Sequence, residues 1–494
     1  MKRTLCLLCS CLLLAGCGAD AQTPADIPEN DAAQTQAVTE ALPAETEDPY
    51  DPGLPERDFG GHEFLFLVRG EAFEPTNFSH EIYAEEENGE AINDAVFQRN
   101  MAVQEQFNIV IREDAADDNA GTVKNMVSAG DNTYDAVMIR PVRAVSIAAD
   151  GYLYDLNTLP YLNLKAEWWD QNAAENLTLN GHLYFINGAL NIMDNNAIWA
   201  LMFNKNLFNR YDIDYPYADV QNGTWTLDKF LDIAKLGGSD LNGDGKMDET
   251  DQYGLIMANE NVFPFVLGAG CRFCERTSDG GAVLNPDIER MSAVLDRLYP
   301  VISDENITLY GERYNGKGYT NFYAQVMRES FRAGRSLMYV SGILSATYLR
   351  DMQDEFGIVP LPKLDAAQET YYSRMQLNNS SMLEVPACCV ETERTGIILE
   401  ALAAKSMTTL SPAYYETTLS GKVARDTESA AMLDLILGSV IFDFAEVFNI
   451  GSVPDLVYAG AMKNQNDIAS KFEKNRSKME KNLTKVIETY GQQS

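Results

Sequence analysis

The sequence is poor in several residue types, and each shortage narrows what the protein can do. Its 494 residues include only three histidines, His62, His80 and His182, and these lack the spacing of metal ligands. Basic residues are scarce as well: 38 Lys and Arg stand against 73 Asp and Glu, a net charge of −35. Because binding to nucleic acid or to anionic lipid needs clustered Lys and Arg, we expect neither as a partner. Beyond the N-terminus, no stretch of about 18–20 residues is apolar enough to span a bilayer.

The N-terminus has the pattern of an export signal. A basic start, Lys2 and Arg3, is followed by the apolar run 5–14 and by a Leu-Ala-Gly-Cys tetrapeptide that ends at Cys17. This order is typical of a secretory signal peptide, and its last four residues resemble a bacterial lipobox, whose cysteine is diacylated. We expect residues 1–16 to be removed and Cys17 to anchor the protein to a membrane. The alternative is an ordinary signal peptide with a chance cysteine.

Residues 17–58 are predicted to be the lipidated cysteine and a disordered acidic tether. From residue 18 to 58 the chain holds six prolines, eleven acids, one base and one aromatic residue. Such a segment buries too little apolar surface to offset the entropy of ordering it, and its like charges favour an extended chain. The folded body is therefore expected to begin at residue 59.

Cysteine is too sparse for a disulfide scaffold. Of the eight cysteines, three would leave with the signal peptide and one would carry lipid, which leaves Cys271, Cys274, Cys388 and Cys389. The first two are spaced for a local disulfide. A redox-active pair lacks a thioredoxin-like context, and adjacent cysteines make a poor half of a zinc site. We expect structural roles for all four.

The body alternates buried strands with amphipathic helices. Continuous apolar runs predict strands, and apolar residues on one helical face predict the helices between them. The first part is predicted as strand 64–68, helix 92–107, strand 108–111, helix 122–128 and strand 134–139. This is the doubly wound α/β pattern, in which ligands bind beyond the carboxyl ends of the strands. Arg140 follows the third strand at such an end.

The rest of the body continues this pattern. Asn180-Gly181 between two apolar runs predicts a tight hairpin turn, and Thr226 after Trp225 suits a helix N-cap. Further strands are predicted at 199–205, 253–257, 337–340 and 356–359, and helices at 394–406 and 468–487.

In this order the chain resembles the family 1 extracellular solute-binding proteins of bacterial ABC importers, which have a maltose-binding-protein-like fold. The resemblance covers most of residues 59–494 and is carried by the stretches 134–137, 151–156, 201–207, 225–230, 331–338 and 356–362. It implies an α/β, two-lobed periplasmic-binding-protein-like fold of type II, with a ligand cleft between lobes joined by crossover strands. The lobes are expected to comprise 59–195 with 378–430, and 196–377 with 431–494.

The resemblance also implies a function. Such a lipoprotein captures a small solute at the cell surface or in the periplasm and delivers it to an ABC importer permease, with no bond made or broken. Many members bind mono- or oligosaccharides, so a carbohydrate is the expected ligand, although a short peptide or an amino-acid derivative stays open. We expect a monomer.

Two other classes of function stay open. A secreted glycan-active enzyme would need only two carboxylates about 5–9.5 Å apart, although GxSxG, HExxH and P-loop motifs are lacking. A non-transport surface binding or sensor protein would use the same fold, because fold does not fix function.

The candidate ligand site follows from sugar chemistry. Sugars present apolar faces and hydroxyls, which aromatic rings with amide and carboxylate edges complement. Trp168 to Asn172 precede the predicted hairpin, and further candidates follow it just before the crossing near residue 199: Asn191, Asp194, Asn195, Asn196 and Trp199. Ser341 and Gly342 lie beyond the 337–340 strand, and Tyr371, Tyr372, Asn378 and Asn379 flank the predicted return crossing. The predicted ligand-binding residues are Arg140, Trp169, Asp170, Asn195, Trp199, Ser341 and Gly342. A place in the core is the alternative for each tryptophan, and a surface ion pair is the alternative for Arg140.

Residues 240–251 fit a calcium-binding loop. The oxygen ligands at positions 1, 3, 5, 9 and 12 would be Asp240, Asn242, Asp244, Asp248 and Asp251. Gly245 occupies the turn position and Lys246 would offer its backbone carbonyl. We expect a bound calcium with a structural role; the alternative is an acidic loop without an ion. Asp251 stands where Glu is usual.

Overall fold

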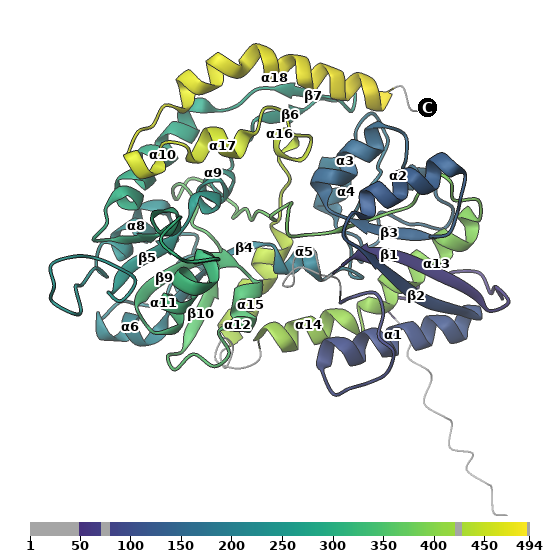
Figure 1. Cartoon of the computed structure of the whole chain (residues 1–494), viewed down its shortest axis with the longest axis horizontal. Coiled ribbons are helices and arrows are strands. Elements are labelled where there is room, and N and C mark those ends of the chain that lie inside the picture. The colour runs from purple at the N-terminus through teal and green to yellow at the C-terminus, as the bar shows by residue number, and fades with distance from the viewer. Residues whose placement is uncertain (1–48, 71–79, 420–426, 492–494) are drawn as a thin grey trace, which may run out of the picture. The chain divides into compact units, whose positions relative to one another are not determined.

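The computed structural model describes residues 49–70, 80–419 and 427–491 (Figure 1). The predicted signal peptide, Cys17 and the tether up to residue 48 lie outside the described residues. The body forms one compact unit, Pro49–Ser494. In the ranges just given, no helix has the length and apolar character needed to cross a membrane.

The first lobe is built on a four-stranded sheet in the order β11-β3-β1-β2. β1 pairs in parallel with both β2 and β3, whereas β11 pairs antiparallel with β3. The interior of this sheet is apolar because helices cover it, which explains the continuous apolar run of β1. The strands are β1 (His62–Arg69), β2 (Ile109–Ala116), β3 (Ala136–Ile139) and β11 (Met382–Glu384).

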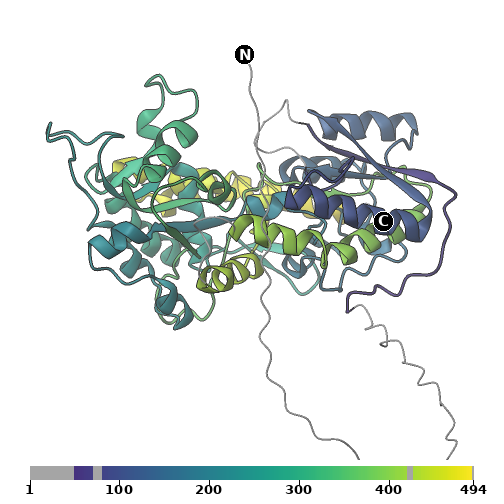
Figure 2. The ribbon, with the colours of Figure 1, turned by 90° about the horizontal axis from the view of Figure 1, so that it is seen from below.

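The helices of the first lobe come from both halves of the chain. α1 and α14 lie side by side, and α13 also packs on α1 (Figure 2). The predicted strand-helix alternation over 64–139 is thus confirmed. The helical segments are α1 (Ala91–Phe107), α2 (Asn119–Ala129), α3 (Pro141–Ala149), η1 (Leu156–Thr158), α4 (Gln171–Leu177), α5 (Met193–Asn196), α13 (Thr392–Ser406) and α14 (Leu410–Leu419).

The second lobe is built on a five-stranded sheet in the order β10-β4-β9-β5-β8. β4 pairs antiparallel with β9 and β10, and β5 pairs in parallel with β8 and β9. β6 and β7 form a separate hairpin. The strands are β4 (Trp199–Asn204), β5 (Tyr253–Met257), β6 (Cys274–Arg276), β7 (Ala282–Leu284), β8 (Thr308–Tyr310), β9 (Ser336–Gly342) and β10 (Phe356–Val359).

Many short helices surround the second sheet. Thr226 occupies the N-cap of α8 as predicted, but its side chain makes no capping hydrogen bond. The helical segments are α6 (Lys205–Arg210), α7 (Tyr217–Gln221), α8 (Leu227–Ala234), η2 (Asn259–Asn261), α9 (Val262–Gly268), α10 (Ile288–Ser303), η3 (Gly311–Tyr314), the π-helix η4 (Tyr323–Arg328), α11 (Glu329–Arg332), α12 (Leu344–Tyr348), α15 (Thr427–Gly438), α16 (Phe444–Val447), α17 (Val453–Tyr458), η5 (Ala461–Lys463) and α18 (Ile468–Gly491).

Three chain segments meet at the junction of the lobes. Ile198 pairs antiparallel with Met375, and Ser373 pairs in parallel with Val440. The chain enters the second sheet through the segment that contains Ile198. It returns to the first sheet through the segment that contains Ser373 and Met375. The third segment joins α15 to α16. This hydrogen-bonded junction is the expected position of a hinge.

The last helix also connects the lobes. α18 packs on α10 and α17 of the second lobe and reaches α3 of the first (Figure 1). Near its end the hydroxyl of Tyr490 donates to the carbonyl of Val145 (3.1 Å), and Asn180 donates to the carbonyl of Ile487 (3.0 Å). Asn180 and Gly181 have φ angles of 53° and 86°, as the predicted hairpin turn requires.

The predicted start of the folded body is corrected. Residues 49–58 were expected in the tether, but Tyr50 and Leu54 are partly buried against the core. Arg57 donates to Glu393 of α13 (3.0 Å). Two apolar side chains and one ion pair thus hold this end of the segment on the first lobe.

The four cysteines of the body are free thiols in the structure. Cys271 and Cys274 are buried, and burial raises the pKa of Cys271 to about 12. Cys388 and Cys389 are half-buried. Thiols with raised pKa values are poor nucleophiles, which agrees with the structural roles we expect for them.

Glu384 of β11 predicts a pH dependence of stability. Its side chain is fully buried, one oxygen accepts from the backbone of Ile139 (2.9 Å), and burial raises its pKa well above 4.5. Because the pKa is raised on folding, this carboxyl costs stability as the pH rises above 4.5, at about 1.4 kcal/mol per unit until the folded pKa is reached.

Glu384→Gln removes this cost while keeping an acceptor for Ile139. The melting temperature of the variant should match wild type near pH 4 and exceed it increasingly up to pH 8. The exposed Glu393→Gln on α13 is the control and should give no such trend. A constant difference at every pH would contradict the buried, neutral carboxyl.

Candidate ligand-binding site

A cavity of about 300 Å³ lies at the junction of the two lobes, a volume in the range of small-molecule sites. One side is formed by the carboxyl end of β9, by α12 and by the π-helix η4 of the second lobe. The other side is formed by Asn196, Gln376 and Asn379, which flank the junction segments. The cavity is therefore lined from both lobes, as a site that closes around its ligand requires.

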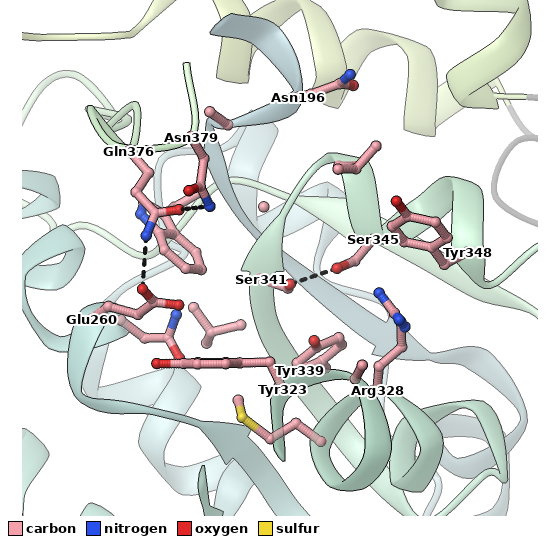
Figure 3. A pocket seen from close by; sticks show the side chains of 18 of the residues that line it. Asn196, Glu260, Tyr323, Arg328, Tyr339, Ser341, Ser345, Tyr348, Gln376 and Asn379 are labelled. Atoms are coloured by element: carbon pink, nitrogen blue, oxygen red, sulfur yellow. Dashed lines mark hydrogen bonds between the residues drawn. The ribbon is translucent and has the colours of Figure 1, made fainter. Parts of the chain in front are cut away.

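A chain of polar side chains crosses one wall of the cavity (Figure 3). The amide of Gln376 donates to the carboxylate of Glu260 (2.7 Å), and the amide of Asn379 donates to Gln376 (2.5 Å). Glu260 belongs to η2 in the second lobe, whereas the two amides lie on the return segment to the first. These groups present both acceptors and donors, which hydroxyl groups can pair with.

Tyr348 and Arg328 lie on the side of the cavity opposite Glu260 and Gln376, and Tyr323 lies between the two sides (Figure 3). Tyr323 and Tyr348 are 37% and 38% exposed although they are large and aromatic, so their surfaces are open to a ligand. The guanidinium carbon of Arg328 lies 4.3 Å from the ring centroid of Tyr348. Tyr323 and Arg328 are the two ends of η4, and a single π-helical turn is a common feature of functional sites.

Small and hydroxyl-bearing residues cover the end of β9. Ser341 and Ser345 are hydrogen-bonded to each other (2.7 Å), and burial raises the pKa of the adjacent Tyr339. At Gly342 a Cβ atom would lie 3.0 Å from the carbonyl oxygen of Asn196. Glycine therefore lets the end of β9 pass close to the junction.

Trp199 lines the same cavity at the start of β4. The residue is 4% exposed, and within the described parts of the chain its Nε1–H has no hydrogen-bond partner. Buried indole N–H groups are normally paired. An acceptor oxygen on a ligand would satisfy this donor.

A second cavity of about 680 Å³ adjoins the first, since Asn196 lines both. It lies at the carboxyl ends of β1 and β2 in the first lobe, where Val68 and Glu113 contribute, and faces Arg350 of the second lobe. Burial, and then the neighbouring Glu81, raises the pKa of Glu113 to about 7.

The middle of the chain matches a known family model. Residues 100–395 fit the model described as bacterial extracellular solute-binding protein, and they make up more than half of the chain. The chain belongs to this family. The family is described as extracellular, so this solute-binding protein is located outside the cytoplasm, either extracellularly or in the periplasm. A comparison with curated proteins finds no match.

Solved structures share the fold of this solute-binding protein at low identity. UgpB from Mycobacterium tuberculosis with glycerophosphocholine is 15% identical, with a TM-score of 0.55 over 87% of this chain and 99% of that one. The GacH receptor of Streptomyces glaucescens, solved unliganded and with acarbose, is 13% identical (0.53; 85% and 99%). A sugar transporter from Rhizobium etli in an open conformation is 12% identical (0.54; 87% and 99%). These likenesses confirm the two-lobed periplasmic-binding-protein-like fold.

The structure brings together three of the seven predicted ligand-binding residues of this solute-binding protein. Trp199, Ser341 and Gly342 line the first cavity, as do Asn196 and Asn379. Arg140 at the N-cap of α3 and Asn195 in α5 line neither cavity.

Trp169 and Asp170 are corrected to structural positions. Trp169 is 1% exposed, and its indole N–H donates to Glu400 of α13 (2.9 Å). Trp168 donates to the other oxygen of the same carboxylate (3.0 Å). Asp170 caps α4 by accepting from the backbone of Ala173 (3.0 Å). An aromatic pair beside a polar residue suits a sugar site, but here the pair anchors the second half of the first lobe.

Sequence reasoning missed the residues that give the cavity its chemistry. Arg328 follows no strand end, Tyr348 lies at the far end of the helix after β9, and the π-helical turn that presents Tyr323 has no periodic pattern. Glu260 follows the predicted strand 253–257 by three residues, and Gln376 is close to the predicted return crossing. These two residues could have been predicted as ligand-binding residues, because ligands of α/β folds bind beyond the carboxyl ends of strands.

The acidic loop 240–251 is closed by its own hydrogen bonds. Asp240 accepts from the backbones of Gly243 (2.7 Å) and Gly245 (2.8 Å), and Gly245 has a φ of 78°. Asp251 is fully buried, and its two oxygens accept from the backbones of Leu241 and Asp248 (both 2.9 Å). Over the described residues, no group of three or more His, Cys, Asp or Glu is arranged to hold a metal ion. Bound calcium stays a prediction.

Glu400 should contribute to the stability of the fold and not to ligand binding. Glu400→Ala leaves two buried indole N–H groups without an acceptor, so it should lower the free energy of unfolding by about 2–4 kcal/mol. The exposed Glu393→Ala on the same helix is the control and should cost less than about 1 kcal/mol. Denaturant titration measures both. Unchanged unfolding combined with lost ligand affinity would return Trp169 to the ligand site.

Proposed function

We propose that this solute-binding protein captures a carbohydrate and delivers it to an ABC importer. The cavity between the lobes is the observation that carries the proposal. Its exposed Tyr323 and Tyr348 offer faces for sugar rings, and Glu260, Gln376 and Asn379 offer hydrogen bonds for hydroxyls. Two structural relatives add support, because one is solved with acarbose and another is described as a sugar transporter.

The capture mechanism follows from the position of the cavity. A ligand held by side chains of both lobes binds the closed form more tightly than the open form, and so favours closure. The junction segments act as the hinge, and the closed shape is what the permease recognises. No bond is made or broken in this cycle.

The cavity gives little support to a glycosidase. A glycosidase needs two carboxylates flanking the scissile bond. Among the described residues that line the first cavity, Glu260 is the only carboxylate, and Gln376 already donates to it. We therefore propose a binding protein rather than an enzyme. We further propose that it works as a monomer, held at the outer face of the membrane by lipid on Cys17.

A binding panel with one variant tests the proposal. Isothermal titration with mono- and oligosaccharides, amino acids and short peptides should give a saccharide that binds and is recovered intact. Tyr323→Ala should weaken its affinity by about ten-fold or more through lost stacking. The exposed Tyr161→Ala in the first lobe should leave affinity unchanged.

Other results of this panel would contradict the proposal. Consumption of the saccharide would indicate an enzyme. Binding of peptides alone would indicate a peptide receptor, and binding of no solute would favour a surface protein without a transport role.

We also propose that loop 240–251 binds calcium. Asp240, Asn242, Asp244 and Asp248 supply oxygens of the type that calcium prefers, whereas Asp251 is engaged in closing the loop. Calcium would stabilise the second lobe by binding only the folded loop.

Calcium should raise the melting temperature, and a chelator should reverse the rise. At about 100 times the dissociation constant the expected gain is about 2.7 kcal/mol. Asp244→Ala should abolish the response, whereas Asp232→Ala, an exposed acid outside the loop, should keep it. An equal response in both variants would contradict the proposed loop.

A further inference from the structure

Arg328 is a cation without an anionic partner in the cavity. It is half-buried and stacks on Tyr348, yet within the described residues it donates no hydrogen bond and forms no ion pair. Acids outnumber bases by 73 to 38 in this chain, so partners are plentiful elsewhere. Arg332, four residues on, pairs with both Glu329 (3.0 Å) and Asp351 (2.9 Å). The guanidinium of Arg328 is thus left available to a ligand.

The cavity is polarised from one end to the other. Glu260 and Arg328 stand at opposite sides of it, with Tyr323 and Ser341 between them (Figure 3). The carboxylate of Glu260 attracts donors such as hydroxyl groups, and it repels anions. The guanidinium of Arg328 attracts acceptors and above all anions. A ligand that matches both ends has hydroxyls at one end and an anionic group at the other.

The Nε1–H of Trp199, which has no partner among the described residues, is a second unmatched donor at this cavity. It is a buried donor in the wall of this cavity, and it needs an acceptor. Ring, hydroxyl and anionic oxygens on a ligand are acceptors, whereas an ammonium group is not.

We propose that the solute is an acidic saccharide, meaning a sugar that carries a carboxylate or phosphate group. The anionic group lies on Arg328, whose planar guanidinium binds two oxygens side by side and is held flat by Tyr348. The ring packs on Tyr323, and its hydroxyls reach Glu260 and Gln376. This inference rests on the proposed function and specifies the substrate class of the same site.

Matched pairs of ligands test the inference on the whole chain. Titration would compare glucuronate and galacturonate, their oligomers, and glucose 6-phosphate with the neutral sugars of the same skeleton. At least one acidic sugar should bind about ten-fold or more tightly than its neutral counterpart. Which acidic class binds separates a carboxylate from a phosphate, and added salt should weaken the preference.

Arg328→Gln should reduce the preference to about one-fold, because it weakens binding of the acidic sugar much more than binding of the neutral sugar. The melting temperature of the variant reports folding. Arg328→Lys keeps the charge and should retain part of the preference. Arg332→Gln is the matched control and should retain all of it.

Two outcomes would overturn the inference alone: neutral sugars bind at least as tightly as acidic ones, or folded Arg328→Gln keeps the preference. Binding of neither class would remove the proposed carbohydrate function as well.

Discussion

Arg374 lies where the three junction segments meet, and its contacts join these segments to one another. Its carbonyl accepts from the backbone of Trp199 (2.9 Å), and its guanidinium pairs with Glu446 of α16. Both side chains of the pair are 8% exposed. A buried pair gains little net stability, but loss of one partner leaves an uncompensated charge. The pair therefore fixes which chain segments meet at the junction more than it adds to total stability.

The composition of the cavity follows from this junction. Trp199 is hydrogen-bonded to Arg374, and Gln376 follows Arg374 by two positions in the sequence. The segments that connect the lobes therefore also supply one wall of the cavity. The opposite wall comes from elements of the second lobe. A ligand that touches both walls is therefore coupled directly to the hinge, without any intermediate element. In the proposed mechanism, binding of the ligand by both walls therefore directly favours closure of the lobes.

Much of the fold could be predicted because its strands are buried on both faces. The runs at 64–68, 253–257 and 356–359 match β1, β5 and β10 closely, and the spacing of Ile468, Phe472, Met479 and Leu483 matches the buried face of α18. β8 and β11 escaped prediction because three residues carry too little pattern. The antiparallel place of β11 beside β3 is set by a contact between distant segments, which local periodicity does not encode.

The candidate site was less predictable for a related reason. Trp199 and Ser341 were predicted because they lie at strand ends, where the fold leaves polar groups beside the cleft. Trp169 looked equivalent in sequence, but Glu400, more than 200 residues later, satisfies its N–H group and removes it from the cleft. Arg328 reaches the cavity from a π-helical turn. Composition shows which side chains suit a sugar, and only tertiary contacts show which of them face it.

The position of β11 has a consequence for how the chain acquires its structure. Glu384 bonds to Ile139 across 245 positions of sequence, and the whole second sheet lies between them. The first sheet cannot be completed until nearly four-fifths of the polypeptide is available. Contacts of such long range slow folding, since the loop must be closed before the pairing is rewarded. The N-terminal half emerging alone would keep one edge of its sheet unpaired, so this chain is suited to folding late, as a whole, rather than lobe by lobe.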